Sequence, residues 1–212
     1  MIRHRYIAVE GPIGVGKTTL VKALADRFGC QTVLEEAGDN PFLPKFYDNP
    51  RRWAFSAQVH FLLSRFQQHR DFAQIEIFSR GVVTDYLFAK DEIFAQVNLQ
   101  PDELDLYYRV YDLLRLQLPK PDLVVYLRAR PEVLLSRIEK RAIHYEQSVS
   151  ADYLEALTEA YDKFFFHYAE TPLLVVDTSE IDVVRREGDL EELVKEIERM
   201  RSGRQHYNPL GS

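Results

Sequence analysis

Residues 11–18 read Gly11-Pro12-Ile13-Gly14-Val15-Gly16-Lys17-Thr18, a complete G-x-x-x-x-G-K-[ST] phosphate-binding loop. The apolar run 6–9 precedes the loop. A helical pattern with Leu20, Leu24 and Phe28 on one face follows it. The motif requires a strand before the glycine-rich loop and a helix after it, and both are predicted here. A turn that matched the motif by chance would lack these neighbours. The stretch therefore predicts a binding site for a nucleoside triphosphate such as ATP.

The loop residues have separate predicted tasks. Glycines let backbone N–H groups point at phosphate oxygens, and the N-terminus of the following helix adds a positive dipole end. The Lys17 ammonium is expected at the β- and γ-phosphates, and the Thr18 hydroxyl at Mg²⁺. The predicted nucleotide-binding residues of this stretch are Gly11, Gly14, Gly16, Lys17, Thr18 and Thr19.

Composition limits the kind of protein. With 212 residues, 46% of them hydrophobic, the chain can build one domain with a sizeable core. A net charge of -6 disfavours a nucleic-acid polymer as main partner, because such proteins carry a basic surface. The one cysteine, Cys30, suits a reducing compartment, so we expect a cytoplasmic protein. We expect no membrane span, since no run of about 18 apolar residues is present, and no signal peptide, since the first predicted strand begins at Tyr6.

Short apolar runs alternate with helical patterns along the chain. The runs are Tyr6–Glu10, Thr32–Glu35, Val82–Asp85, Leu123–Leu127 and Leu173–Asp177. Continuous apolar runs are typical of parallel strands that are buried on both faces. The order predicts an α/β fold with a doubly wound, five-stranded parallel sheet flanked by helices. Most of these runs lead into polar residues, which places a ligand crevice beyond the carboxyl ends of the strands.

The helical patterns and the polar segments complete the predicted organisation. Helices are expected over about 50–71, 102–118, from Pro131 onward, over 151–168 and from Asp189 onward. Residues 1–200 are expected to form a single domain of the phosphate-loop kinase type, with a small lid at about 137–150. The polar tail 201–212 is expected to be flexible.

A phosphate loop alone does not name a reaction, so other residues must discriminate. Glu35 and Glu36 end the second predicted strand, where a carboxylate could take a proton from an attacking hydroxyl. The alternative for such a pair is a solvated acidic turn. Arg137 and Arg141 are four residues apart on one helix face. They could neutralise a transferring phosphoryl group or form a basic solvent face.

The predicted helix over 50–71 carries groups suited to a planar base. Gln58 and Arg65 lie on one helix face, and an amide and a guanidinium can both hydrogen-bond a base edge. Trp53 and Phe61 could hold a ring between them, or could be ordinary core residues.

Several stretches together resemble the deoxyribonucleoside kinases, and within them the bacterial deoxyadenosine/deoxyguanosine kinase branch. The resemblance extends over most of the chain and is carried by GPIGVGKTT at 11–19, DNPFLPKFYDN at 39–49, RRWAFSAQ at 51–58, FLLSRF at 61–66 and SRIEKR at 136–141. It implies an ATP- and Mg²⁺-dependent transfer to the 5′-hydroxyl of a purine deoxynucleoside, with deoxycytidine as a further substrate. It also implies a homodimer built on long helices.

The resemblance also assigns roles to residues of this chain. Glu35 matches the general base, and Asp85 matches an acidic residue near Mg²⁺. Tyr47 and Glu146 match residues that hold the 3′-hydroxyl. Gln58 matches the residue that pairs with the base, and Arg65 and Asp91 match the pair at its far edge. Arg137 and Arg141 match lid arginines that clamp the donor phosphates.

The chain departs from the pattern at two positions. Tyr86 stands where an arginine is expected after Asp85, and Ile143 stands where a third lid arginine is expected. Arg80, Lys140 and Arg128 are alternative sources of the missing charge.

Three rival functions are weaker. A thymidylate-like monophosphate kinase needs cations in its acceptor site, where this chain offers carboxylates. A non-catalytic scaffold would not need an intact Lys17-Thr18. A GTPase switch would carry an Asn-Lys-x-Asp motif, which is absent from the sequence.

Overall fold

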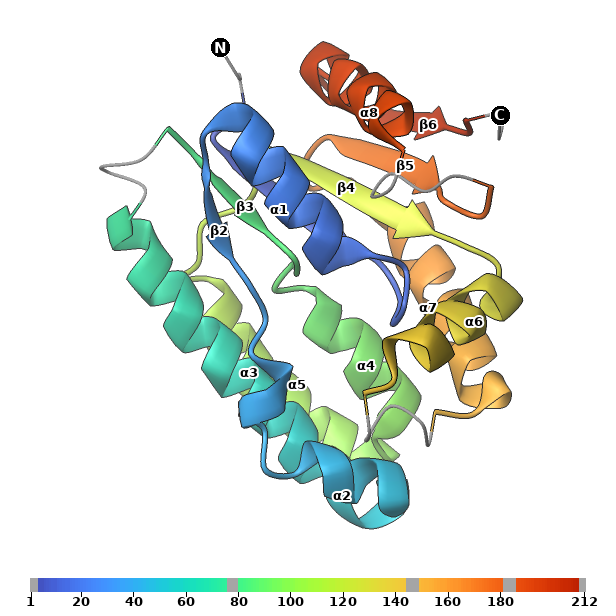
Figure 1. Ribbon diagram of the computed structural model, residues 1–212. Helices are drawn as coiled ribbons and strands as arrows, with labels where there is room; N and C mark the ends of the chain where they lie inside the picture. The colour runs from blue at the N-terminus through green and yellow to red at the C-terminus, as the bar shows by residue number, and fades with distance from the viewer. Residues whose placement is uncertain (1–3, 76–79, 144–148, 181–185, 210–212) are drawn as a thin grey trace.

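The structure is a computed structural model that describes residues 4–75, 80–143, 149–180 and 186–209. A parallel sheet with the strand order β2-β3-β1-β4-β5-β6 forms its middle layer (Figure 1). The strands are β1 Tyr6–Glu10, β2 Gln31–Val33, β3 Val82–Thr84, β4 Leu123–Arg128, β5 Leu173–Asp177 and β6 Arg204–Tyr207. Since β1 lies between β3 and β4, the chain reverses its winding direction there, and the phosphate loop follows that strand.

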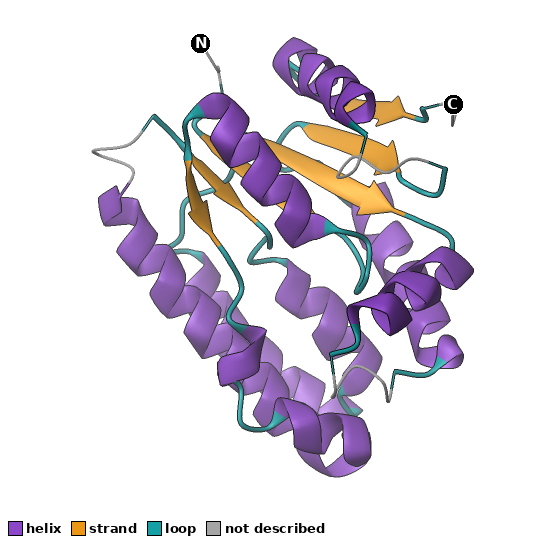
Figure 2. Cartoon of the chain, viewed as in Figure 1, coloured by secondary structure: helices purple, strands orange, loops and turns teal. Residues whose placement is uncertain are grey.

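Helices cover both faces of the sheet (Figure 2). They are α1 Lys17–Phe28, α2 Leu43–Asp48, α3 Pro50–Ile75, α4 Lys90–Asn98, α5 Pro101–Arg115, α6 Pro131–Arg141, α7 Ala151–His167 and α8 Glu187–Arg199, with a short 3₁₀ turn at Ala37–Asp39. Alternate residues of each strand point to opposite faces. In β1, Ile7 and Val9 pack with α1, α6 and α8, whereas Tyr6 and Ala8 pack with α4 and α7. A third cluster joins α2, α3 and α5 beside the sheet.

The predicted α/β class and parallel sheet are confirmed, but the predicted strand count is wrong. The sheet has a sixth strand, β6, which lies within the tail that was expected to be flexible. Residues 204–207 pair with β5 in parallel register from Leu173 to Val176. A polar strand with one partner has no apolar run, so its sequence resembles a loop.

Two short helices were not predicted. They are α2 and α4, which follow the strand ends and carry parts of the site. The second strand ends at Val33, earlier than expected, so Glu35 lies in the loop after it. No helix among the described residues is long and apolar enough to cross a membrane.

Candidate active site

The phosphate loop connects β1 to α1 and approaches α6 closely. Gly14 has φ +82°, and a Cβ there would lie 2.9 Å from the Leu134 carbonyl oxygen and 2.8 Å from Ile138 Cγ1. Only glycine allows this approach without displacing α6. The Lys17 ammonium donates to the carbonyl oxygens of Gly11 at 2.7 Å and Pro12 at 3.1 Å, so it lies within the curve of the loop.

Asp85 ties together three strand ends. Its Oδ2 accepts a hydrogen bond from Thr18 Oγ1 at 2.6 Å, and its Oδ1 accepts one from the Glu35 backbone N–H at 2.6 Å. The loop after β1, the loop after β2 and the end of β3 therefore meet at this carboxylate. Two hard oxygen ligands beside the phosphate loop fit Mg²⁺, which binds through one or two protein oxygens together with substrate phosphates.

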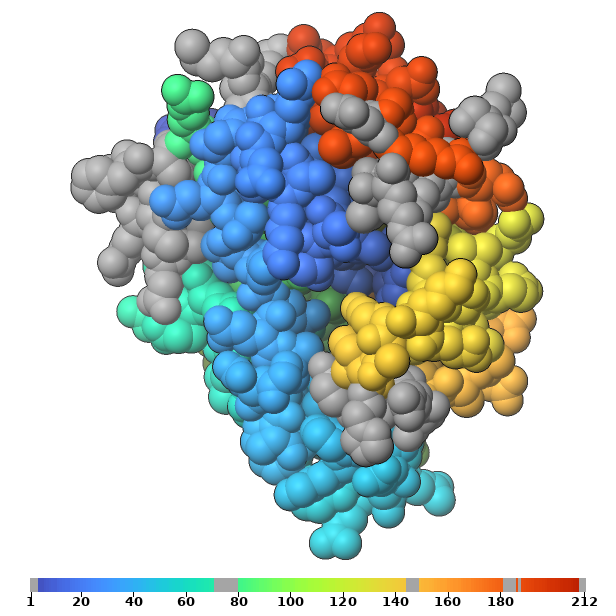
Figure 3. Space-filling view, in the orientation of Figure 1, coloured from blue at the N-terminus to red at the C-terminus, as the bar shows by residue number. Residues whose placement is uncertain are grey.

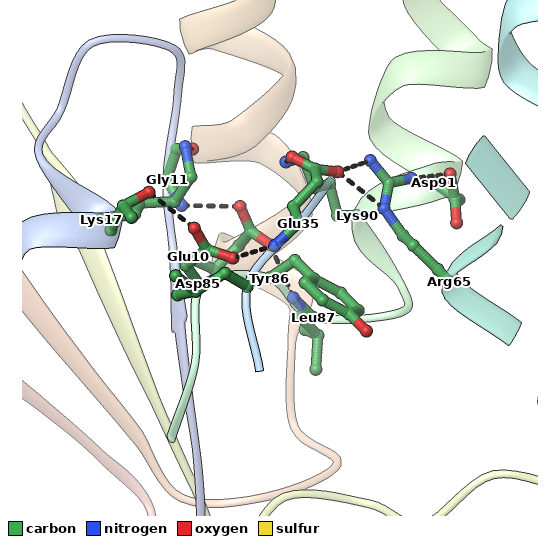
Figure 4. A network of polar contacts seen from close by, with 12 residues as sticks. Glu10, Gly11, Lys17, Glu35, Arg65, Asp85, Tyr86, Leu87, Lys90 and Asp91 are labelled. Atoms are coloured by element: carbon green, nitrogen blue, oxygen red, sulfur yellow. Dashed lines mark hydrogen bonds and ion pairs between the residues drawn. The ribbon is translucent and has the colours of Figure 1, made fainter. Parts of the chain in front are cut away.

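Glu35 is held by two buried cations. Arg65 donates to Glu35 Oε1 through Nε at 2.9 Å and also through Nη2, and Lys90 Nζ donates to Oε2 at 2.8 Å (Figure 4). Burial by itself would raise the pKa of the Glu35 carboxyl, but the charges of Arg65 and Lys90 outweigh it and hold that pKa well below its ordinary value. Glu35 is therefore a carboxylate that accepts hydrogen bonds through both oxygens.

Arg65 continues the network into the protein. Its Nη1 donates to Oδ1 of Asp91, a fully buried residue on the first turn of α4. Burial outweighs the attraction of Arg65 and raises the pKa of the Asp91 carboxyl to about 7. Asp91 Oδ2 and Gln58 Oε1 are buried and have no hydrogen-bond partner among the described residues. Both oxygens are acceptors that a ligand donor can satisfy.

Except for Asp91, which is fully buried and does not line it, these side chains surround one cavity of about 310 Å³. It is lined by nine of the predicted site residues: Gly14, Lys17, Thr18, Glu35, Tyr47, Gln58, Arg65, Asp85 and Arg141. In the space-filling view, α6 lies beside the residues of the phosphate loop (Figure 3).

Other predicted site residues lie elsewhere. Trp53 does not line this cavity. Its ring stacks on Phe42, with centroids 5.9 Å apart. Arg137 bonds the carbonyls of Val15, at 3.3 Å, and Thr178, at 2.8 Å, so it ties the phosphate loop to the end of β5. Thr19 is exposed on the first turn of α1. Glu146 lies outside the described residues.

Two buried charged residues near the cavity were not identified from the sequence. Glu10, fully buried at the end of β1, accepts from the backbone N–H groups of Gly11 at 2.8 Å and Leu87 at 2.7 Å, and from the Tyr161 hydroxyl at 3.0 Å. Its position before the phosphate loop was a usable signal. Lys90 gave none, because a lysine next to an aspartate is typical of a solvated helix start.

The structure also tests the three alternative sources of charge. Arg80 lies beside Gly29, at the opposite end of the sheet from the cavity. Arg128 is half-exposed, 3.6 Å from Asp162 Oδ2 and 3.9 Å from Asp177 Oδ2. Lys140 is exposed on α6. None of the three lines the cavity.

Comparison with known proteins agrees with this geometry. A family model described as deoxynucleoside kinase matches residues 7–201. The chain is 37% identical to a deoxyguanosine kinase of Bacillus subtilis (strain 168), over 92% of this chain and 97% of the relative. It is 32% identical to a deoxyadenosine/deoxycytidine kinase of the same organism, over 92% of each chain.

A solved structure of deoxyadenosine kinase from M. mycoides with bound dATP has a similar fold. Its TM-score is 0.80 at 25% identity, and the match covers 91% of this chain and 98% of that one. One assignment follows from the phosphate loop, the carboxylate in the loop after β2 and the extended sequence similarity. The chain belongs to the deoxynucleoside kinase family and is a phosphotransferase.

Proposed function

We propose that the protein transfers the γ-phosphoryl group of ATP to the 5′-hydroxyl of a purine deoxynucleoside. The observation that carries this proposal is one cavity lined by Lys17 and Thr18 of the phosphate loop, by Glu35, and by Gln58 and Arg65 of α3. Asp85 binds Thr18 and the Glu35 backbone, and Arg65 binds the Glu35 side chain, so Glu35 lies between the phosphate loop and α3. Triphosphate, reacting hydroxyl and base can then occupy one continuous site, in that order. Catalysis consists of positioning and charge stabilisation.

The proposed reaction assigns a task to each group at the cavity. Glu35 accepts the proton of the 5′-hydroxyl, whose oxygen attacks the γ-phosphorus. Lys17 and the loop N–H groups would hold the phosphates, and Arg141, which lines the cavity at the end of α6, would contact them. Thr18 and Asp85 would hold Mg²⁺. Bound there, the ion would neutralise charge on the donor phosphates. Tyr47 lines the same cavity and is proposed at the 3′-hydroxyl together with Glu146.

The base end favours a purine. Gln58 Oε1 is a buried acceptor, which an amino group of the base can satisfy. Adenine offers an acceptor N7 beside a 6-amino donor, which Arg65 and Asp91 together complement. Guanine offers N7 and O6, which Arg65 alone can satisfy. Thymine would place a methyl group against charged atoms, at a cost of several kcal/mol if water is excluded. Deoxycytidine, with its amino group, is expected as a weaker substrate.

A substrate panel tests the proposal. The purified full-length protein with ATP and Mg²⁺ is given each of the four deoxynucleosides, and separately dAMP, dGMP and dTMP, with products separated by chromatography. We expect 5′-monophosphates from deoxyadenosine or deoxyguanosine, with thymidine lowest. Lys17→Ala is expected to lose activity and keep its melting temperature, because the hydrogen bonds of the Lys17 ammonium to described residues go only to the loop carbonyls of Gly11 and Pro12. Turnover of monophosphates alone, or preference for thymidine, would overturn the proposal.

We further propose a cytoplasmic homodimer. A deoxynucleoside kinase that uses ATP and has one free cysteine suits the cytoplasm. Four large apolar side chains of α3, α5 and the turn after α5 are at least half exposed: Leu63, Leu106, Leu113 and Leu116. Such a face is typical of a helix-to-helix interface. Light scattering after size exclusion is expected to give twice the chain mass, and Leu106→Glu with Leu113→Glu is expected to give the monomer.

A further inference from the structure

Lys90 has an unusual place for a lysine. It is the first residue of α4, and only 4% of its surface is exposed. Both facts are unfavourable, because the helix dipole repels cations at its N-terminus and a buried ammonium loses its hydration. A lysine retained at such a site needs compensating partners or a ligand.

Lys90 lies beside the groups that are proposed to carry out phosphoryl transfer. Its Nζ donates to Glu35 Oε2 at 2.8 Å and lies 5.4 Å from the centroid of the Phe94 ring. It lines the same cavity as Lys17 and Thr18. An ammonium has three N–H donors, so donation to Glu35 leaves others for a ligand oxygen. The ammonium thus lies next to the carboxylate that is proposed to activate the acceptor.

Other cations do not occupy this position. Among the described residues, the lysines and arginines that line the cavity are Lys17, Arg65, Lys90 and Arg141. Arg65 binds Asp91 and the other oxygen of Glu35, Lys17 belongs to the phosphate loop, and Arg141 approaches from α6. Tyr86 is fully buried, with its ring 5.3 Å from that of His69, so position 86 brings no charge to the cavity.

We propose that Lys90 is a catalytic residue whose ammonium contacts the phosphoryl group during its transfer, on the acceptor side of the γ-phosphorus. The bond from the 5′-oxygen to phosphorus forms while the bond from phosphorus to the β–γ bridging oxygen breaks, and the hydroxyl proton passes to Glu35. Lys90 remains protonated and donates hydrogen bonds to phosphoryl oxygens. This inference rests on the proposed 5′-kinase reaction.

Three variants test the charge at this position. Lys90→Met removes the ammonium and keeps a long side chain, Lys90→Arg keeps the charge, and Lys120→Met is the control, since Lys120 is 68% exposed and pairs with Glu170. We expect Lys90→Met to lower kcat about 10²- to 10³-fold, the usual worth of one transition-state donor, with both KM values changed less than about threefold. Lys90→Arg is expected to recover at least about tenfold of that loss, because the charge is retained. Lys120→Met is expected to match wild type.

A second background separates catalysis from the positioning of Glu35. In Glu35→Gln, adding Lys90→Met is expected to lower the residual single-turnover rate by at least about tenfold more, since the phosphoryl group still needs its cation. No further loss would overturn the inference and make Lys90 a positioning residue. If Lys90→Met does not fold, Lys90→Gln takes its place, and wild-type-like kcat in that variant would overturn the inference too. An inactive wild-type protein would instead count against the proposed function.

Discussion

At the residue scale, the candidate active site contains a chain of buried charges. Lys90 and Arg65 each donate to Glu35, and Arg65 also donates to Asp91, so the four side chains form one connected series. Buried charges are costly unless each is paired, and removing one partner is more damaging than removing a pair. The residue that is proposed to read the base therefore also holds the proposed general base, which links substrate choice to catalysis through Arg65.

The first prediction concerns the two carboxylates after β2. Glu35→Gln keeps the side-chain size and removes the proton acceptor, so kcat is expected to fall by about 10² to 10⁴. Glu36→Gln is the matched control and is expected to change kcat less than about threefold, because no hydrogen bond within the described part of the chain joins the Glu36 side chain to the Glu35, Arg65 and Lys90 network. Steady-state kinetics of both variants would show the reverse order if the assignment is wrong.

The second prediction concerns the Arg65–Asp91 pair. Arg65→Leu leaves the fully buried Asp91 without its ion partner and is expected to cost about 3–5 kcal/mol of unfolding free energy at pH 8. Asp91→Leu is expected to cost less, because Arg65 keeps Glu35 as a partner. The double variant is expected to be more stable than Arg65→Leu alone.

Urea unfolding of the four proteins measures this coupling, and additive losses would contradict it. On activity, the double variant is expected to raise kcat/KM for thymidine relative to deoxyadenosine, because the charged edge of the base site is gone. An unchanged ratio in the substrate panel would mean that other residues select the base.

At the element scale, the last strand connects parts of the fold that are distant in sequence. Arg204 opens β6, and its Nη2 donates to the carbonyls of Phe165 at 2.8 Å, Phe166 at 2.9 Å and Tyr168 at 3.1 Å. These are carbonyls at the C-terminal end of α7, where a cation is favourable to the helix dipole. Arg204, from the C-terminal tail, therefore caps the C-terminal end of α7. The same helix carries Tyr161, whose hydroxyl donates to Glu10.

The third prediction follows from that contact. Arg204→Ala is expected to lower the unfolding free energy by about 1–2 kcal/mol, since it leaves helix carbonyls without a charged donor. Arg199→Ala is the control: its ion pair with Glu196 is mostly exposed on the arginine side and is expected to be worth less than about 0.5 kcal/mol. Thermal or urea unfolding that ranks the two equally would show that the contacts of Arg204 with the end of α7 add no specific stability.

At the scale of the whole molecule, His69 lies where the helical side meets the sheet. Only 1% of it is exposed, and its ring lies 6.2 Å from Tyr6, 5.3 Å from Tyr86 and 5.9 Å from Phe88, centroid to centroid. Burial, assisted by the charge of Arg65, lowers the pKa of His69 to about 4. The folded protein therefore keeps this imidazole neutral at pH values where the unfolded chain protonates it.

The fourth prediction is a pH dependence of stability. Because the pKa of His69 is lower in the folded state than in the unfolded state, its contribution to stability is full above about pH 6.5 and falls as the pH drops towards 4. Between pH 8 and pH 5 the wild type is expected to lose about 2 kcal/mol relative to His69→Phe. Urea unfolding of both proteins at several pH values measures the difference, and a constant difference would contradict the prediction.

The sequence alone determined the fold class, and it predicted the donor half of the candidate site. The phosphate loop needs a strand before it and a helix after it, and both are local patterns of neighbouring residues. Apolar runs likewise placed five strands. In β1, β3, β4 and β5 almost every residue is buried, and burial on both faces gives a continuous apolar run, whereas the residues of β2 are exposed or half-buried. The family resemblance added Glu35, Gln58 and Arg65, which the structure brings to one cavity.

Only the tertiary structure decided how the charges are connected. Lys90 and Glu35 are 55 residues apart, and Glu10 and Tyr161 are 151 apart, so no local pattern relates them. The structure also placed Trp53 on Phe42 and outside the cavity, and it added β6, whose polar residues are defined by the strand beside them. Local sequence patterns reflect the burial and backbone conformation that each residue requires. The pairing of charged side chains depends on which strand ends lie next to one another in the folded sheet.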